Sequence, residues 1–88
     1  MALKIIGSAD GEAVARQMRE AIEAAIAGAR AEVTPASSGH FVVRVIAPAF
    51  EGRGAVQRQQ LVYAALAHLM AGEAPPVHAI DRMDTATP

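Results

Sequence analysis

Residues 39–63 read GHFVVRVIAPAFEGRGAVQRQQLVY, and this stretch decides how the chain folds. From Phe41 to Ile46 it is rich in the β-branched and aromatic residues that strands favour. Pro48 ends that strand, and the glycine-rich segment that follows indicates a turn. Phe50 lies within the turn and is expected to fill the core. The stretch therefore predicts a strand, a turn and the start of a helix.

Apolar residues then recur at three- and four-residue steps, which indicates an amphipathic helix that ends near Gly72. These residues are Val56, Leu61, Val62, Ala65, Leu66, Leu69 and Met70. The same spacing predicts a first helix over residues 12–29, and its apolar positions are Val14, Met18, Ala21, Ile22, Ala25 and Ile26. Each helix thus has one face suited to packing against a sheet.

The N-terminal part contains a lead-in, a short strand and a loop. Residues 1–11 are expected to be a terminal lead-in, with Ser8 or Asp10 capping the helix that follows. Residues 31–34 predict a short strand, and residues 35–39 predict a hairpin loop that leads into the central strand.

The C-terminal part supplies one more strand after a rigid Pro-Pro connector. Residues 77–83 alternate apolar with small or polar side chains, which is typical of a strand. We expect residues 12–84 to form a single domain and residues 85–88 to form a flexible tail. The element order is then α-β-β-α-β. This order predicts an α+β sandwich, with a three-stranded sheet packed on helices.

Composition excludes several classes of function. The chain has 88 residues, a formal net charge of −1 and no cysteine, so disulfides, thiol catalysis and a protein-only Cys-ligated metal site are excluded. The charge gives no overall attraction to nucleic acid or anionic membranes. No apolar run approaches the roughly 20 residues of a membrane span, so we expect a cytoplasmic protein with no membrane partner.

Three histidines are the side chains best suited to metal binding or proton transfer near neutral pH. The helical pattern makes His68 a helix-surface residue. His40 directly precedes the central strand, and His78 is expected one residue inside the last strand, where either a structural or a ligand role fits the pattern. No nucleophile, base and orienting group occur at a catalytic spacing, so the chain is not expected to be an enzyme.

Arg44, Arg53 and Arg58 lie close in sequence around the turn and the start of the second helix. Together with a helix N-terminus, they predict a small patch that contacts phosphates. Glu51 dilutes this charge, and three arginines give only modest affinity. A nucleic-acid interface is therefore an alternative hypothesis, not the leading one.

Four short motifs together resemble the BolA family. They are GHF at 39–41, FEG at 50–52, RQQLVY at 58–63 and VHA at 77–79. The Gln59-Gln60 pair is most similar to the IbaG-type bacterial branch, since other members have Arg-His-Arg at the helix start. The resemblance covers roughly residues 12–88. It implies a fold similar to the class II KH domain, in agreement with the element order.

The resemblance also implies a function and a cofactor. Members of this family partner monothiol glutaredoxins and share a bridging [2Fe-2S] cluster with the glutaredoxin and glutathione, whereas some act as DNA-binding transcriptional regulators. His78 matches the family's C-terminal histidine, which is a cluster ligand. The usual loop Cys or His is missing here, so His40 is the nearest candidate for a second ligand.

From this resemblance we expect an adaptor in iron–sulfur trafficking or stress response. No cofactor is expected in the isolated chain, because a protein without cysteine has too few ligands to hold such a cluster alone. Docking is expected around His78, the loop before Phe41 and the start of the second helix. The chain is expected to be a monomer or a weak homodimer by itself. The alternative is a KH-like DNA-binding regulator that uses the three arginines.

Overall fold

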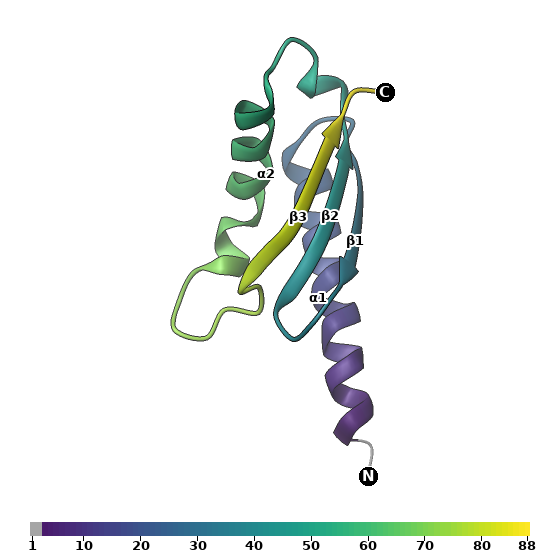
Figure 1. The fold of residues 1–88 in the computed structure, drawn as a ribbon, viewed down its shortest axis with the longest axis vertical. Coiled ribbons are helices and arrows are strands. Elements are labelled where there is room, and N and C mark those ends of the chain that lie inside the picture. The colour runs from purple at the N-terminus through teal and green to yellow at the C-terminus, as the bar shows by residue number, and fades with distance from the viewer. Residues whose placement is uncertain (1–2) are drawn as a thin grey trace.

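The structure is a computed structural model that describes the backbone of residues 3–88 and the side chains of residues 11–88. Its elements are α1 (Leu3–Ala25), β1 (Arg30–Pro35), β2 (His40–Ile46), a 3-10 helix η1 (Pro48–Phe50), α2 (Ala55–Met70) and β3 (Ala79–Ala86). Figure 1 shows both long helices on one side of the three strands. The predicted α+β class and the order α-β-β-α-β are confirmed.

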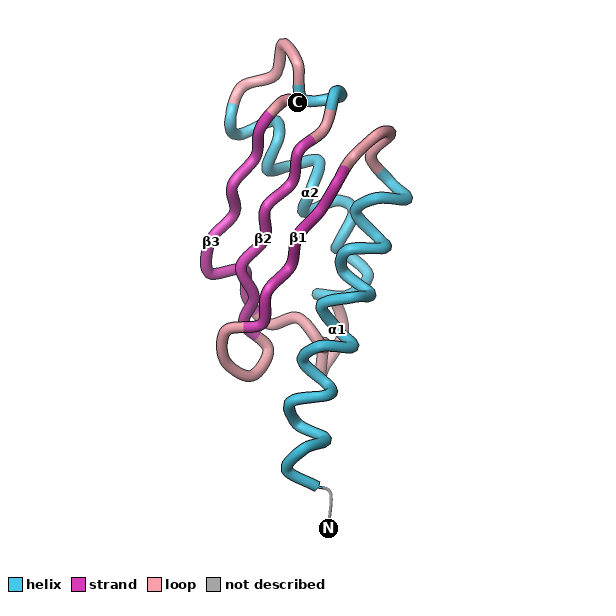
Figure 2. The backbone as a smooth tube through the Cα atoms, turned by 90° about the vertical axis from the view of Figure 1, so that its right-hand side faces the viewer, coloured by secondary structure: helices cyan, strands magenta, loops and turns pink. Residues whose placement is uncertain are grey.

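The strands form one sheet in the order β1-β2-β3, as Figure 2 shows. β1 and β2 are antiparallel and joined by a hairpin, whereas β3 runs parallel to β2. A parallel neighbour requires a crossover connection, which α2 provides. As a result β2 and β3 begin at the same end of the sheet, where His40 lies opposite Ala79. α2 begins at the other end, after β2 has finished.

The central strand anchors the core through its alternating side chains. Phe41, Val43 and Val45 are each at most 1% exposed, whereas Arg44 between them is exposed on the outer face. Full burial of one such apolar side chain contributes roughly 1.5–3 kcal/mol, which fixes the face that β2 turns toward the helices. The helices add Ala15, Met18, Ile22, Val62, Ala65, Leu66 and Leu69 to this core, and Ile26 joins it directly after α1.

Phe50 is fully buried, which confirms its predicted position in the core. The turn around it is held by main-chain hydrogen bonds, from Phe50 N to Ala47 O at 3.1 Å and from Arg53 N to Phe50 O at 3.0 Å. Within residues 3–88, no helix combines the length and hydropathy that a membrane-spanning segment needs.

The predicted N-terminal boundaries need correction. α1 begins at Leu3 and passes through Ser8 and Asp10, so neither residue caps the helix and most of the expected lead-in is helical. Residues 1–2 lie outside the described part of the chain. α1 also continues through Gly7, because one glycine inside a helix costs only about 1 kcal/mol. The helix ends at Ala25, before the predicted position, and Gly28 with φ +73° follows in the turn.

The last strand is shifted by a few residues from its predicted position. β3 begins at Ala79 because Val77 is buried in the core and donates its N–H to Leu69 O at 3.1 Å. It continues to Ala86, which lies opposite Ile46, so the predicted flexible tail is wrong for Thr85 and Ala86. Main-chain pairing with β2 holds these residues, and one β-branched residue, Thr85, is too short a pattern to predict a strand from the sequence.

Glu23 of α1 protects the free edge of the sheet. Its carboxylate Oε2 accepts a hydrogen bond from Ala31 N of β1 at 3.0 Å, so one outward-facing donor of this edge strand is satisfied. We expect Glu23→Ala to lower the free energy of unfolding by about 1 kcal/mol, measured by urea denaturation. Glu20→Ala, at an exposed position of the same helix, is the control. Equal stabilities of the two variants would show that the hydrogen bond contributes nothing.

Candidate functional site

His78 has a fixed backbone and an exposed side chain. It lies in the loop directly before β3, not inside the strand as predicted. Its N–H donates to Gly39 O at 2.8 Å, and Ala79 N donates to the same carbonyl at 3.1 Å. Val77, on its other side, is 1% exposed and anchors the loop in the core. The imidazole is therefore presented to solvent from a position held on both sides.

Gly39 brings the hairpin between β1 and β2 against this histidine. An added Cβ at Gly39 would lie 2.7 Å from both Cγ and Nδ1 of His78, which is closer than a Cβ comes to a non-bonded atom in real proteins. Gly39 also has φ +75°, a left-handed conformation that glycine adopts without steric conflict. The turn is closed by a hydrogen bond from His40 N to Ser37 O at 2.8 Å. Glycine at this position thus allows the imidazole to lie directly against the hairpin.

His40 is the first residue of β2 and lies at the same end of the sheet as His78. Its ring nitrogen Nδ1 is 2.8 Å from Oδ1 of Asp81 in β3. Both side chains are partly exposed, at 40% for His40 and 44% for Asp81. Among residues 11–88, no side chain or main-chain group forms a hydrogen bond with the other ring nitrogen, Nε2. The two predicted ligand residues therefore lie at the same end of the sheet, and one of them has a carboxylate partner.

A groove of about 930 Å³ opens beside His78. One wall is α1 from Gly11 to Gln17, the second is the hairpin from Thr34 to Gly39, and the connector residues Pro75 and Pro76 complete it. The groove is lined by small and apolar groups together with polar side chains, which are those of Glu12, Gln17, Thr34, Ser37 and Ser38. It gives a partner protein a shaped depression next to an exposed imidazole.

The donor set of this end of the molecule consists of two imidazoles. Within residues 11–88, no three histidine, aspartate or glutamate side chains converge on a common point. A metal centre that included His78 and His40 would need its other ligands from a second molecule. The assignment of both histidines as metal ligands stays a prediction.

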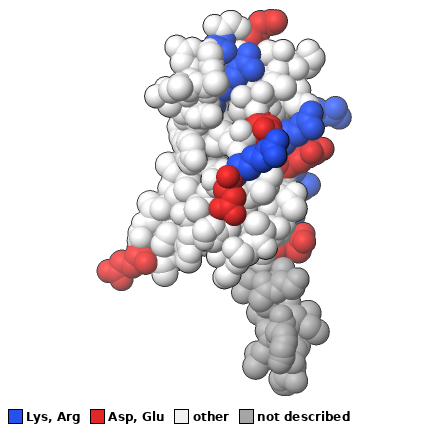
Figure 3. Space-filling model, viewed as in Figure 1, with Lys and Arg blue, Asp and Glu red and all other residues white. Residues whose placement is uncertain are grey.

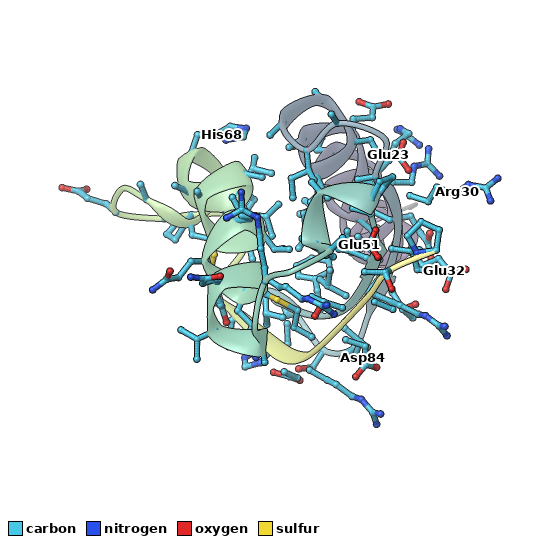
Figure 4. All side chains as sticks on the ribbon, turned by 90° about the horizontal axis from the view of Figure 1, so that it is seen from above. Glu23, Arg30, Glu32, Glu51, His68 and Asp84 are labelled. Carbon is cyan, nitrogen blue, oxygen red and sulfur yellow. The ribbon has the colours of Figure 1, made fainter. Side chains whose placement is uncertain are left out.

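His68 has the position that the helical pattern predicted for it. It is exposed in the last turn of α2, and Figure 4 shows it projecting on the side of the helix away from β3. It takes no part in the site formed by His40 and His78.

The three arginines do not form one patch. Arg44 is on the outer face of the sheet, between Glu32 of β1 and Asp84 of β3, and Figure 3 shows positive and negative atoms intermixed across this face. Arg53 is in the turn before α2 and Arg58 is in the first turn of α2, where Nε of Arg53 donates to Ala49 O and Nε of Arg58 donates to Arg53 O. The prediction of a joint phosphate-contacting patch therefore gains no support from the arrangement.

Arg58 has a structural contact that the sequence did not indicate. Its guanidinium lies over the Phe50 ring, 5.8 Å from the ring centroid, at a distance typical of a cation–π interaction. This turn is at the end of the sheet opposite to His78, because α2 runs back along the full length of the strands. The predicted docking surface, which joined His78 to the start of α2, is corrected accordingly.

Sequence reasoning missed Asp81 and Gly39 as parts of the site. Asp81 lies 41 positions from His40 in the chain. Gly39 is in the predicted hairpin loop, and nothing in the loop sequence indicates its contact with His78. The contact of each depends on how β3 lines up with β2, and this register is not visible in either segment alone.

Comparison with known proteins gives a consistent family match. The model of the BolA family, described as BolA-like protein, matches residues 15–88, which include His40, His78, Asp81 and Gly39 but not the first residues of the groove wall in α1. BolA-like protein 1 from Homo sapiens and its counterpart from Pongo abelii are each 48% identical over 48 residues, or 54% of this chain and 33% of the relative. The match thus spans about a third of the length of these curated relatives.

Solved structures share the fold. A bolA protein homologue from Coxiella burnetii superposes with a TM-score of 0.64 at 32% identity, covering 83% of this chain and 88% of the homologue. The BolA domain of SufE1 from Arabidopsis thaliana gives 0.67 at 28% identity, with 85% and 92% covered. BolA1 from Mus musculus gives 0.66 at 34% identity, with 85% and 65% covered.

Proposed function

The chain belongs to the BolA family, and from this we propose that it is a non-enzymatic adaptor that binds a monothiol glutaredoxin and co-ligates a bridging [2Fe-2S] cluster. Its role would be in iron–sulfur trafficking or the stress response. The Gln59-Gln60 pair favours the IbaG-type branch within the family. In this proposal the chain works in the reducing cytoplasm, where glutathione is available, and is a monomer or a weak homodimer before it meets its partner.

The observation that carries the proposal is the presentation of His78. Two hydrogen bonds to Gly39 O fix the backbone at His78 and Ala79, while the ring itself is exposed. A ligand for a cluster shared between two proteins must be rigid enough to hold its geometry and open enough to be reached from outside. His78 meets both conditions, and the groove beside it gives the partner a surface to contact.

The histidines of this chain would supply only a minority of the cluster's ligands. Histidine in place of thiolate on one iron of a [2Fe-2S] cluster raises the reduction potential. With no cysteine in the chain, the thiolate ligands would come from the glutaredoxin and glutathione. His78, with His40 as the second donor, would bind at the iron nearest to this chain.

The geometry favours docking at the end of the sheet that carries both histidines. This docking surface consists of the hairpin loop 36–39, the connector before His78 and the neighbouring part of α1. It leaves out the start of α2, which is at the opposite end. Charged groups near this surface are few, so shape and the cluster itself would supply most of the specificity.

A spectroscopic titration tests this function. A monothiol glutaredoxin carrying a reconstituted cluster is titrated with this protein, and we expect the visible circular dichroism to change until about one chain is bound per cluster, because imidazole replaces an existing ligand. The cluster-free glutaredoxin serves as the control and should give no visible signal. An unaltered spectrum with the wild-type chain would rule out the proposal.

A further inference from the structure

We infer that Asp81 is a positioning residue that holds His40 with Nε2 facing outward as the available donor nitrogen. This inference deepens the proposed function and depends on it only where the cluster is concerned. It starts from the contact between Nδ1 of His40 and Oδ1 of Asp81 at 2.8 Å. A carboxylate only accepts hydrogen bonds, so the neutral ring must place its proton on Nδ1 to make this bond. The lone pair is then on Nε2.

A β-bulge lies next to this contact. Phe41 lies opposite Ile80, but the next residue, Val42, lies opposite Arg82, so Asp81 is the extra residue of β3. Without the bulge, strand alternation would turn Arg82 toward the core face beside Val43. The bulge keeps Arg82 on the outer face and leaves Asp81 with no paired residue in β2. Bulges often redirect a side chain next to a functional site.

The cation next to Asp81 in the sequence pairs with a different carboxylate. Arg82 is the adjacent cation, and its Nε donates to Oδ2 of Asp84 at 3.1 Å, further along the strand. The main chain at His40 is fixed as well, because its N–H donates to Ser37 O and its carbonyl accepts from Ala36 N, both at 2.8 Å. Both ends of the His40 side chain are therefore defined, the Cα by the hairpin and Nδ1 by Asp81.

Stability alone does not account for this pair. Both side chains are about two-fifths exposed, and exposed pairs contribute little to folding. Histidines that bind metals commonly donate their other ring N–H to a carboxylate, which fixes the ring and its tautomer, and loss of that partner lowers metal affinity by about 10- to 100-fold. The arrangement of His40 and Asp81 has this form. His40 pairs with Ala79, the residue after His78, so both donors are at one end of the sheet.

The first arm of the test needs no cluster. Ring nitrogen chemical shifts of His40 are measured by NMR in the free protein at about pH 8.5, above the usual range of histidine titration. We expect the Nδ1–H tautomer in the wild type and a shift toward Nε2–H in Asp81→Ala. Asp84→Ala, which removes another carboxylate of β3, should leave His40 unchanged. A wild-type ring in the Nε2–H form would overturn the inference.

The second arm uses the glutaredoxin complex. We expect the cluster to be lost from the Asp81→Ala complex about 10-fold faster than from wild type, with His40→Ala showing at least the same effect and Asp84→Ala showing none. The melting temperature of Asp81→Ala should stay within about 5 °C of wild type, which separates positioning from unfolding. An unchanged rate of cluster loss for Asp81→Ala would overturn the positioning role while leaving the proposed function intact. Absence of any cluster signal with wild type would overturn the proposed function, and with it the ligand role of His40. The first arm would still show whether Nδ1 of His40 donates to Asp81.

Discussion

Replacing His78 with alanine should abolish the change in visible circular dichroism that this chain produces in a cluster-loaded glutaredoxin. The imidazole is exposed and its backbone is fixed on both sides, by Val77 in the core and by the Gly39 carbonyl. Alanine keeps the N–H that donates to Gly39 O at 2.8 Å, so the loop keeps its anchor while the donor nitrogens are lost. The variant therefore removes the chemistry and leaves the docking surface in place.

The control for this experiment is His68→Ala, an exposed histidine of α2 that is outside the site. It should give the wild-type spectrum at every ratio. Both variants should unfold within about 0.5 kcal/mol of wild type, as is usual for surface positions without special contacts. A His78→Ala titration that matched the wild-type curve would mean that His78 is not a ligand, whatever the partner.

The fold was predictable because burial in this chain follows simple periodicity. Phe41, Val43 and Val45 alternate with outward residues, and the apolar positions of both helices recur at helical spacing. These patterns determine which face is buried, and that is enough to fix the element order. They do not determine where an element ends. β3 is extended to Ala86 by main-chain pairing with β2, and this pairing leaves no pattern in the side chains.

The site was predictable only in part, because its contacts cross between strands. His78 and His40 were found through residue type and the family resemblance, and the sheet places them at one end. Asp81 could not be linked to His40, because the link depends on the register between β2 and β3. The arginines were grouped by sequence distance, but a strand and a turn direct them to different parts of the surface. Closeness in sequence is a poor guide to a site wherever the chain changes direction.

Gly39→Ala is expected to lower the free energy of unfolding by about 2–3 kcal/mol and also to disturb the site. Two penalties add at this position. The left-handed conformation, with φ +75°, costs a non-glycine residue roughly 1–2 kcal/mol. The new Cβ would also lie 2.7 Å from the His78 ring, which must rotate away from its preferred position at a further expense of about 1 kcal/mol. Urea denaturation measures the total.

Gly52→Ala separates the two penalties. Gly52 has nearly the same conformation, with φ +77°, but a Cβ added there meets nothing within 4 Å. It should therefore lose only the backbone part, about 1–2 kcal/mol, and keep the wild-type cluster spectrum, whereas Gly39→Ala should weaken that spectrum by displacing His78. In the double variant Gly39→Ala with His78→Ala the two ring contacts at 2.7 Å are gone and only the contact with Cβ of residue 78 at 3.2 Å remains, so the loss of stability should fall close to that of Gly52→Ala. A double-mutant coupling near zero would show that His78 does not lie against Gly39 in solution, and the rigid presentation of its imidazole would then have to come from the Val77 anchor alone.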